Sequence, residues 1–198
     1  MTDIESNSFL IVGLGNPGRE YRSTRHNAGY MVIDALCETF SIRLARLQSK
    51  ALVGTGSWDT KKIILAKPQT FMNLSGQSVS SLLRFYKIPL EQMLVIHDDL
   101  DLPVGTLRMR PGGGSPGQRG LTSIIEQLGT QEFPRLRIGI GRPPGQMDPA
   151  DYVLEDFWGS EKELLPQLFI RAVDAVKDFL QYGLEHAMNG FNGTLQKE

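Results

Sequence analysis

The chain has 198 residues, and 40% of them are apolar, so it is long enough for one large domain with a sizeable core. Its net charge of −1 at pH 7 is too weak for a bulk nucleic-acid binder of the histone type, but it excludes no other partner. A single cysteine, Cys37, no stretch of about 18 apolar residues and no signal-peptide pattern at residues 1–8 together predict a cytoplasmic protein without a membrane span.

Predicted strands and helices alternate through the first half of the chain. Residues 9–14 (FLIVGL) form a short apolar run that ends in glycine, which is typical of a buried strand. After a polar segment rich in glycine and arginine, apolar residues recur with helical spacing between positions 31 and 40. Further strands are predicted at residues 51–57, 62–66 and 93–97, and a second helix at residues 79–86.

Arginines mark two predicted strands in the second half. Arg108 and Arg110 alternate with apolar residues on one strand, and Arg135 and Arg137 do the same on another. Since successive strand residues point to opposite faces, each strand places its arginines on one face. A glycine-rich loop at residues 112–120, followed by a helix that ends near position 128, separates the two strands.

Charge is unevenly distributed in this half. Six arginines and two acids lie between positions 106 and 142, whereas six acids and one lysine lie between positions 148 and 163. The first region is suited to phosphate and the second is not. Ordinary surface variation is the alternative explanation, and charge alone does not separate the two.

The order of the elements predicts the fold class. A last helix is expected to begin at Ser160, where Glu163 completes a capping-box pattern, and to end near Gly183. Strands that alternate with helices indicate an α/β fold, and strands that follow one another closely indicate some antiparallel pairing. We therefore expect one domain, residues 1–198, with a twisted mixed, mostly parallel β-sheet and helices on both faces.

The segment Gly13 to Gly18 (GLGNPG) matches the pattern G-x-G-x-x-G of dinucleotide-binding proteins. That site requires a helix that opens at the loop, but here the helical spacing starts roughly ten residues later. The acidic residue expected at the end of a second strand is also missing. The late helix and the missing acid therefore argue against an NAD-dependent oxidoreductase, and the glycines are better explained by a tight turn that displays Asn16.

His26 and the segment HDDLD at residues 97–101 are the strongest candidates for chemistry. A histidine in a polar loop can accept a proton near neutral pH, and Asp98, at the end of a buried strand, is placed to orient its ring. The acids of HDDLD are also compatible with Mg²⁺ or with a simple polar turn. The three histidines lack the spacing of zinc ligands, and no G-x-S-x-G motif supports a serine nucleophile.

Asn73 precedes the second helix within residues 71–76 (FMNLSG). One interpretation is structural, because Asn73 or Ser75 would make a suitable helix N-cap. The functional interpretation is that the Asn73 amide donates a hydrogen bond to a carbonyl oxygen that becomes negative during a reaction. Asn16 is a candidate for the same role.

Taken together, these motifs resemble the bacterial peptidyl-tRNA hydrolase family over nearly the whole chain. Each motif is weak alone, but their joint order is specific. The matching segments are residues 11–18 (IVGLGNPG), Tyr21, 24–29 (TRHNAG), 70–76 (TFMNLSG), 97–103 (HDDLDLP), 112–114 (GGG) and 135–141 (RLRIGIG).

The resemblance implies a monomeric, cytoplasmic α/β enzyme of translation that rescues tRNA from abandoned peptides. Such an enzyme cleaves the ester between the peptide and the 3′ ribose of peptidyl-tRNA, with no metal or cofactor. By this resemblance His26 is the general base and Asp98 its partner. The implied substrate-binding residues are Asn16, Tyr21, Phe71, Met72, Asn73 and Arg119. The implied binders of tRNA phosphate are Arg108, Arg110 and Arg137.

One segment departs from the family pattern. The family usually has Gly-His-Asn-Gly after the glycine loop, whereas this chain has glutamine and arginine at positions 118 and 119. By the resemblance, the asparagine of that pattern contacts the peptide or the attacking water, whereas Arg119 at its position can donate hydrogen bonds but cannot accept them. The departure leaves an alternative function open, that of a catalytically weak RNA-binding module with the same fold.

Overall fold

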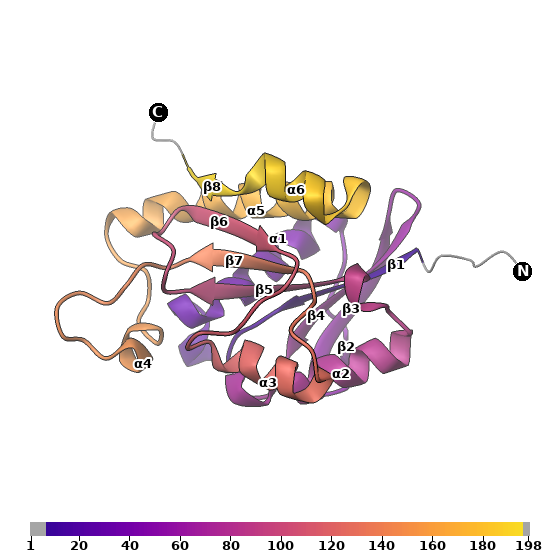
Figure 1. Cartoon of the computed structure of the whole chain (residues 1–198), viewed down its shortest axis with the longest axis horizontal. Coiled ribbons are helices and arrows are strands. Elements are labelled where there is room, and N and C mark those ends of the chain that lie inside the picture. The colour runs from indigo at the N-terminus through magenta and orange to yellow at the C-terminus, as the bar shows by residue number, and fades with distance from the viewer. Residues whose placement is uncertain (1–6, 196–198) are drawn as a thin grey trace, which may run out of the picture.

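Eight strands form one mixed sheet in the computed structural model, which describes residues 7–195 (Figure 1). Residues 1–6, part of the start that lacks a signal-peptide pattern, lie outside the described residues. The strands are β1 (Ser8–Gly13), β2 (Arg46–Gln48), β3 (Ala51–Trp58), β4 (Lys61–Pro68), β5 (Met93–Asp99), β6 (Thr106–Arg110), β7 (Arg135–Gly139) and β8 (Gly193–Thr194).

The strand order is β2-β3-β4-β1-β5-β7-β6-β8. The four central strands of this order, β4, β1, β5 and β7, pair in parallel, and antiparallel strands extend the sheet on both sides. The prediction of a mixed sheet with a parallel centre is therefore confirmed. Because β1 and β5 are parallel neighbours, the loops that follow them meet at the same edge of the sheet.

Helices cover both faces of the sheet, as predicted (Figure 1). Helices α1, α5 and α6 pack on one face, and α2 and α3 cover the other. Within residues 7–195, no helix is long and apolar enough to cross a membrane. The helices are α1 (Ala28–Phe40), α2 (Ser75–Tyr86), α3 (Arg119–Leu128), α4 (Pro149–Tyr152), α5 (Ser160–Tyr182) and α6 (Leu184–Phe191).

The continuous apolar run of β1 reflects burial on both faces. Ile11 packs in the core beneath α1 and α5, whereas Leu10 and Val12 pack in the core beneath α2 and α3. All three side chains are completely buried. A central parallel strand has no solvated face, so its sequence does not alternate between apolar and polar residues.

Two predicted helix caps are wrong. Helix α2 has Leu74 at its N-cap and no side-chain cap, so neither Asn73 nor Ser75 caps it. In helix α5 the N-cap is Gly159, with a φ of 51° that suits glycine, and Ser160 is the first helical residue. Ser160 is therefore not the N-cap, and the predicted capping box does not form. Glu161 instead accepts a hydrogen bond from the backbone N–H of Trp158.

Several short elements carried no usable sequence pattern. These are β2, α4, α6 and β8, so α5 is not the last helix of the chain. Helix α3 begins at Arg119, two residues before the predicted helix, and the glycine loop ends at Gln118. This earlier start matters for the site, because it places Gln118 at the N-cap of α3.

Candidate active site

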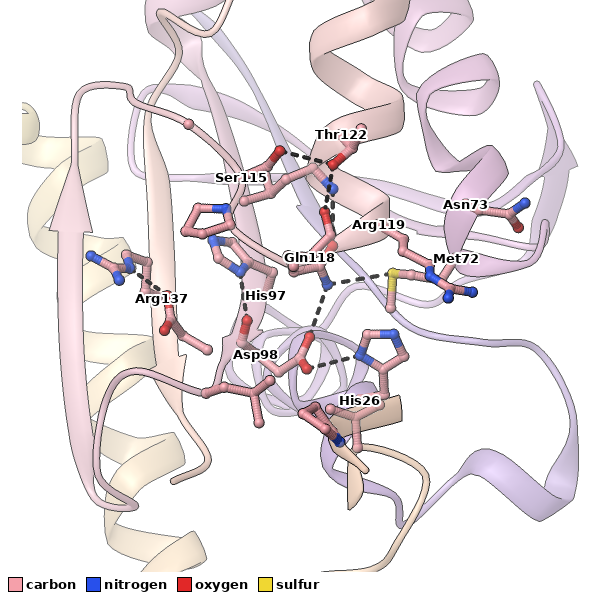
Figure 2. Close-up of a pocket in the computed structure, with 18 of the residues that line it drawn as sticks. His26, Met72, Asn73, His97, Asp98, Ser115, Gln118, Arg119, Thr122 and Arg137 are labelled. Atoms are coloured by element: carbon pink, nitrogen blue, oxygen red, sulfur yellow. Dashed lines mark hydrogen bonds and ion pairs between the residues drawn. The ribbon is translucent and has the colours of Figure 1, made fainter. Parts of the chain in front are cut away.

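A cleft of about 1020 Å³ lies at the edge of the sheet where the central parallel strands end (Figure 2). Its walls come from the end of β5, the loop between β6 and α3, the start of α3, the turn before α2 and the segment around α4. Ligands of open α/β sheets bind in such crevices beyond the carboxyl ends of the strands. Most of the predicted site residues line this cleft.

His26 and Asp98 meet inside the cleft (Figure 2). Asp98 lies at the end of β5, and His26 lies in a short 3₁₀ helix, Arg25–Asn27, just before α1. The distance from His26 Nδ1 to Asp98 Oδ2 is 2.8 Å, and the Asp98 side chain is only 3% exposed. When Nδ1 carries the ring proton and donates a hydrogen bond to the carboxylate, Nε2 is left as the proton acceptor of the ring.

The environment of this pair favours an ionised carboxylate beside a basic imidazole. Burial opposes the imidazolium, but the charge and the hydrogen bond of Asp98 outweigh it and raise the pKa of His26, against an opposing effect of Arg119. Burial also opposes the Asp98 carboxylate, yet the charge and hydrogen bond of His26, together with the bond from Gln118, lower its pKa. The pair can therefore take up and return a proton while Asp98 stays charged.

Gln118 is a site residue that the sequence analysis missed. Its Nε2 donates to Asp98 Oδ1 at 2.9 Å, so the two oxygens of the carboxylate have different partners. Its Oε1 accepts from the backbone N–H of Leu121 at 2.9 Å and thereby caps α3. Glutamine is not a preferred N-cap residue, so the sequence carried no signal for either role.

The turn from Gly13 to Gly18 presents Asn16 to the cleft. Asn27 holds the Asn16 backbone by two bonds, accepting from its N–H at 2.8 Å and donating to its carbonyl at 3.0 Å. Asn16 Oδ1 accepts from the backbone N–H of Met72 at 2.9 Å, which fixes the side-chain amide and assigns its NH₂ as the available donor. A Cβ at Gly15 would lie 2.7 Å from the Tyr30 ring, so close packing explains this glycine.

Arg25 connects the short 3₁₀ helix that contains His26 to the segment around α4. Its side chain is completely buried, and its guanidinium carbon lies 4.4 Å from the Tyr152 ring centroid and 4.1 Å from that of Trp158. It forms an ion pair with Glu161 of α5 and donates to the carbonyl of Asp156. These contacts hold the backbone beside His26, whose N–H donates to the Val153 carbonyl at 2.8 Å.

The predicted substrate-binding residues fall into two groups. Asn16, Phe71, Met72, Asn73 and Arg119 all line the cleft. Phe71 is 60% exposed, which leaves an aromatic surface open at the cleft. Tyr21 does not line it and lies, half-buried, in a short 3₁₀ helix of the first loop.

The predicted phosphate-binding arginines share one face of the sheet. In the register of β6 and β7, Arg108 is opposite Arg137 and Arg110 is opposite Arg135. Arg110 and Arg137 line the cleft, whereas Arg108 does not. The Nε of Arg137 donates to Asp99 Oδ2 at 2.6 Å, which orients its guanidinium.

Arg135 serves the structure of the site. It is buried, and it donates to the carbonyls of Gly114 at 3.1 Å and Gln131 at 2.8 Å. Burial lowers the pKa of Arg135 to about 10, so it stays protonated at neutral pH. Its guanidinium therefore holds the glycine-rich loop in place through the Gly114 carbonyl.

The acids of HDDLD have separate partners, which argues against their sharing an ion. Asp98 faces His26 and Gln118, Asp99 faces Arg137, and Asp101 pairs with Arg142. Across the described range 7–195, no group of three or more His, Cys, Asp or Glu side chains is arranged to hold a metal ion. The arrangement instead favours chemistry by a histidine and a single oriented carboxylate.

Comparisons with known proteins give one consistent result. Residues 10–198 match the protein-family model described as peptidyl-tRNA hydrolase. The chain is 52% identical, over 185 residues, to the peptidyl-tRNA hydrolase of Thermoanaerobacter sp. (strain X514), covering 93% of this chain and 100% of that protein. It is 51% identical to the chloroplastic peptidyl-tRNA hydrolase of Arabidopsis thaliana, over 93% of this chain and 64% of that protein. The crystal structure of peptidyl-tRNA hydrolase from Acinetobacter baumannii is 38% identical, with a TM-score of 0.89 and 96% of each chain covered.

Proposed function

The chain belongs to the peptidyl-tRNA hydrolase family and hydrolyses peptidyl-tRNA to free tRNA and peptide, and we propose that His26 and Asp98 carry out this reaction. The observation that carries the proposal is the 2.8 Å contact between His26 Nδ1 and Asp98 Oδ2 inside the cleft. It makes Nε2 the basic atom of the imidazole ring. A histidine oriented in this way can activate water for ester hydrolysis.

In the proposed reaction, His26 Nε2 takes a proton from a water molecule as the water oxygen attacks the ester carbonyl carbon. Asp98 stabilises the imidazolium that forms. The ester bond between the carbonyl carbon and the 3′ oxygen then breaks, and the imidazolium returns the proton to that oxygen. The amides of Asn16 and Asn73 are proposed to donate to the carbonyl oxygen while it is negative, and one such donor is worth about 3–4 kcal/mol.

The rest of the cleft is proposed to bind the two parts of the substrate. Phe71 offers an exposed ring on which a base can stack, next to Met72 and Asn73. Arg119 is proposed to bind the phosphate of the terminal nucleotide. Tyr21 is proposed to contact the same end of the tRNA from the first loop, and the arginines at positions 108, 110 and 137 are proposed to hold a phosphate of the acceptor stem.

We further propose that residues 1–198 act as one domain and as a monomer in the cytoplasm. The steps above use only water and side chains of a single chain, which supports a monomeric catalyst. Peptidyl-tRNA released early from ribosomes is the proposed source of substrate. Sedimentation at assay concentration tests the assembly state, and a stable dimer would contradict it.

The variant His26→Ala tests the mechanism directly. Loss of a general base is expected to lower turnover of peptidyl-tRNA by about 10²–10⁴-fold, while tRNA binding persists. Release of peptide from labelled peptidyl-tRNA measures turnover, and filter binding measures affinity. Turnover at the wild-type rate in this variant would refute the role of His26.

A further inference from the structure

The Gln118 side chain uses both ends of its amide (Figure 2). Its NH₂ group donates to the catalytic carboxylate, and its carbonyl oxygen accepts from the first turn of α3. Met72 Sδ lies 3.5 Å from the same NH₂ group, and the side chain is buried. The residue therefore joins the α3 terminus to Asp98 directly.

Only one orientation of this amide satisfies both contacts. After a flip, the carbonyl oxygen would face the Asp98 carboxylate, and both groups only accept hydrogen bonds when Asp98 is ionised. The NH₂ group would then face the backbone N–H of Leu121, and both groups only donate. The cap therefore fixes which end of Gln118 faces Asp98.

We infer that Gln118 is a positioning residue for the hydrolysis, because it holds Asp98 Oδ1 and so turns Oδ2 toward His26. This inference rests on the proposed roles of His26 and Asp98. With one donor on each oxygen, the plane of the carboxylate is set by two contacts of 2.8 Å and 2.9 Å. Without Gln118, a carboxylate that is 3% exposed would lack a partner on one oxygen and would be free to rotate away from the ring.

An amide also differs from the histidine that the family pattern usually has here, because it does not titrate. The donor that faces Asp98 is therefore present at every pH. The other charged or titratable groups that act on the pair are His97, whose pKa burial lowers, and Arg119, whose charge opposes protonation of His26. If replacing Gln118 lowers activity, we therefore expect the cause to be a His26 ring that is less well oriented by Asp98 and less basic.

Two variants separate this role from capping. Gln118→Ser keeps a good N-cap and removes the donor to Asp98. It is expected to lower kcat about 10- to 100-fold with little change in KM, and to lower the pKa of the His26 ring measured by NMR. Gln118→Glu keeps the cap and nearly the same shape, but it places a second carboxyl group against Asp98.

The pH profile of Gln118→Glu gives a separate signature. Two carboxyl groups in contact share a proton, so at low pH the introduced acid can still donate to Asp98. As pH rises and that proton leaves, the two like charges repel, and activity is expected to fall over a range where the wild-type rate still rises. A purely structural role for Gln118 would produce no such alkaline fall.

Gly129→Ala is the matched control for helix stability. Gly129 ends the same helix with a φ of 69°, so alanine strains α3 at the end remote from Asp98, with space around the new Cβ. The inference is supported if Gln118→Ser loses kcat and Gly129→Ala, with a similar shift in Tm, does not. It is overturned if Gln118→Ser, folded by circular dichroism, keeps the wild-type kcat and His26 titration, or if Gly129→Ala reproduces its loss.

The outcome is distinguishable from failure of the proposed mechanism when His26→Ala is assayed alongside. Wild-type turnover in His26→Ala would refute the mechanism itself. An inactive His26→Ala with a normal Gln118→Ser would refute the positioning role alone. If Gln118→Ser fails to fold, Gln118→Glu carries the test, since it retains the cap, and an unchanged pH profile in that variant would refute the inference.

Discussion

Asp98→Asn is expected to disable the site by reversing the tautomer of His26. The carboxylate now accepts from His26 at 2.8 Å and from Gln118 at 2.9 Å, and an asparagine can accept at only one of its two ends. Because the cap prevents Gln118 from turning, the introduced carbonyl oxygen faces Gln118 and the introduced NH₂ group faces the imidazole. Nδ1 must then accept, the proton moves to Nε2, and the base that faces the cleft is lost.

Asp98→Asn is thus expected to lower kcat about 10³–10⁴-fold at neutral pH, equivalent to roughly 4–5.5 kcal/mol of activation free energy. Single-turnover release of peptide measures the loss, and ¹⁵N NMR of the ring reports which nitrogen carries the proton. Adding Gln118→Glu should restore at least tenfold of the rate, since the introduced carboxylate accepts from the introduced amide and frees its oxygen for His26. A rate within tenfold of wild type in the single variant, or an unchanged tautomer, would refute this reasoning.

Three further variants test separate parts of the site. Arg119→Asn removes a charge that opposes protonation of His26, so the pKa of His26 should rise. The acid limb of kcat/KM, where activity rises with pH as His26 deprotonates, should then move to higher pH, and a limb that stays in place or moves to lower pH contradicts this. Arg137→Ala should weaken tRNA binding and flatten the dependence of log affinity on log salt by about one unit; an unchanged slope in titrations from low to high salt argues against a phosphate contact. Arg25→Met leaves Glu161 without its buried partner and is expected to cost about 2–3 kcal/mol in urea unfolding, whereas a cost near zero would show that the aromatic contacts suffice.

The sequence predicted the frame of the site because its pattern is local. The apolar runs of β1 and β5 identified two buried strands, and parallel neighbours place their following loops at one edge. His26 and Asp98 follow or end these two strands, so topology brings together residues 72 positions apart. Their residue types, the polar loop around His26 and the place of Asp98 at a strand end made them candidates, and the family resemblance gave them their roles.

The supporting contacts could not be predicted in the same way. Gln118 acts through a helix that begins two residues earlier than its apolar pattern indicated, and Arg25 acts through aromatic residues about 130 positions away in the chain. Neither contact leaves a periodic or compositional trace. The capping box predicted at Ser160 did not form in a region with such a tertiary contact, where Glu161 pairs with Arg25 and accepts from the backbone N–H of Trp158.

The two residues that depart from the family pattern have opposite effects on the same proton. The hydrogen bond of Gln118 lowers the pKa of Asp98 and so favours the carboxylate whose charge raises the pKa of His26, whereas the charge of Arg119 lowers the pKa of His26. A histidine at position 118 would add a second cation beside the imidazole whenever it was protonated, on top of the charge of Arg119. A neutral donor at 118 avoids that repulsion, which suits the roles proposed above, in which the glutamine orients Asp98 and the arginine binds phosphate. On this reasoning, Gln118→His should move the acid limb of activity to lower pH, and by less when Arg119 is present than when it is replaced by asparagine, because the arginine charge also opposes protonation of the introduced histidine.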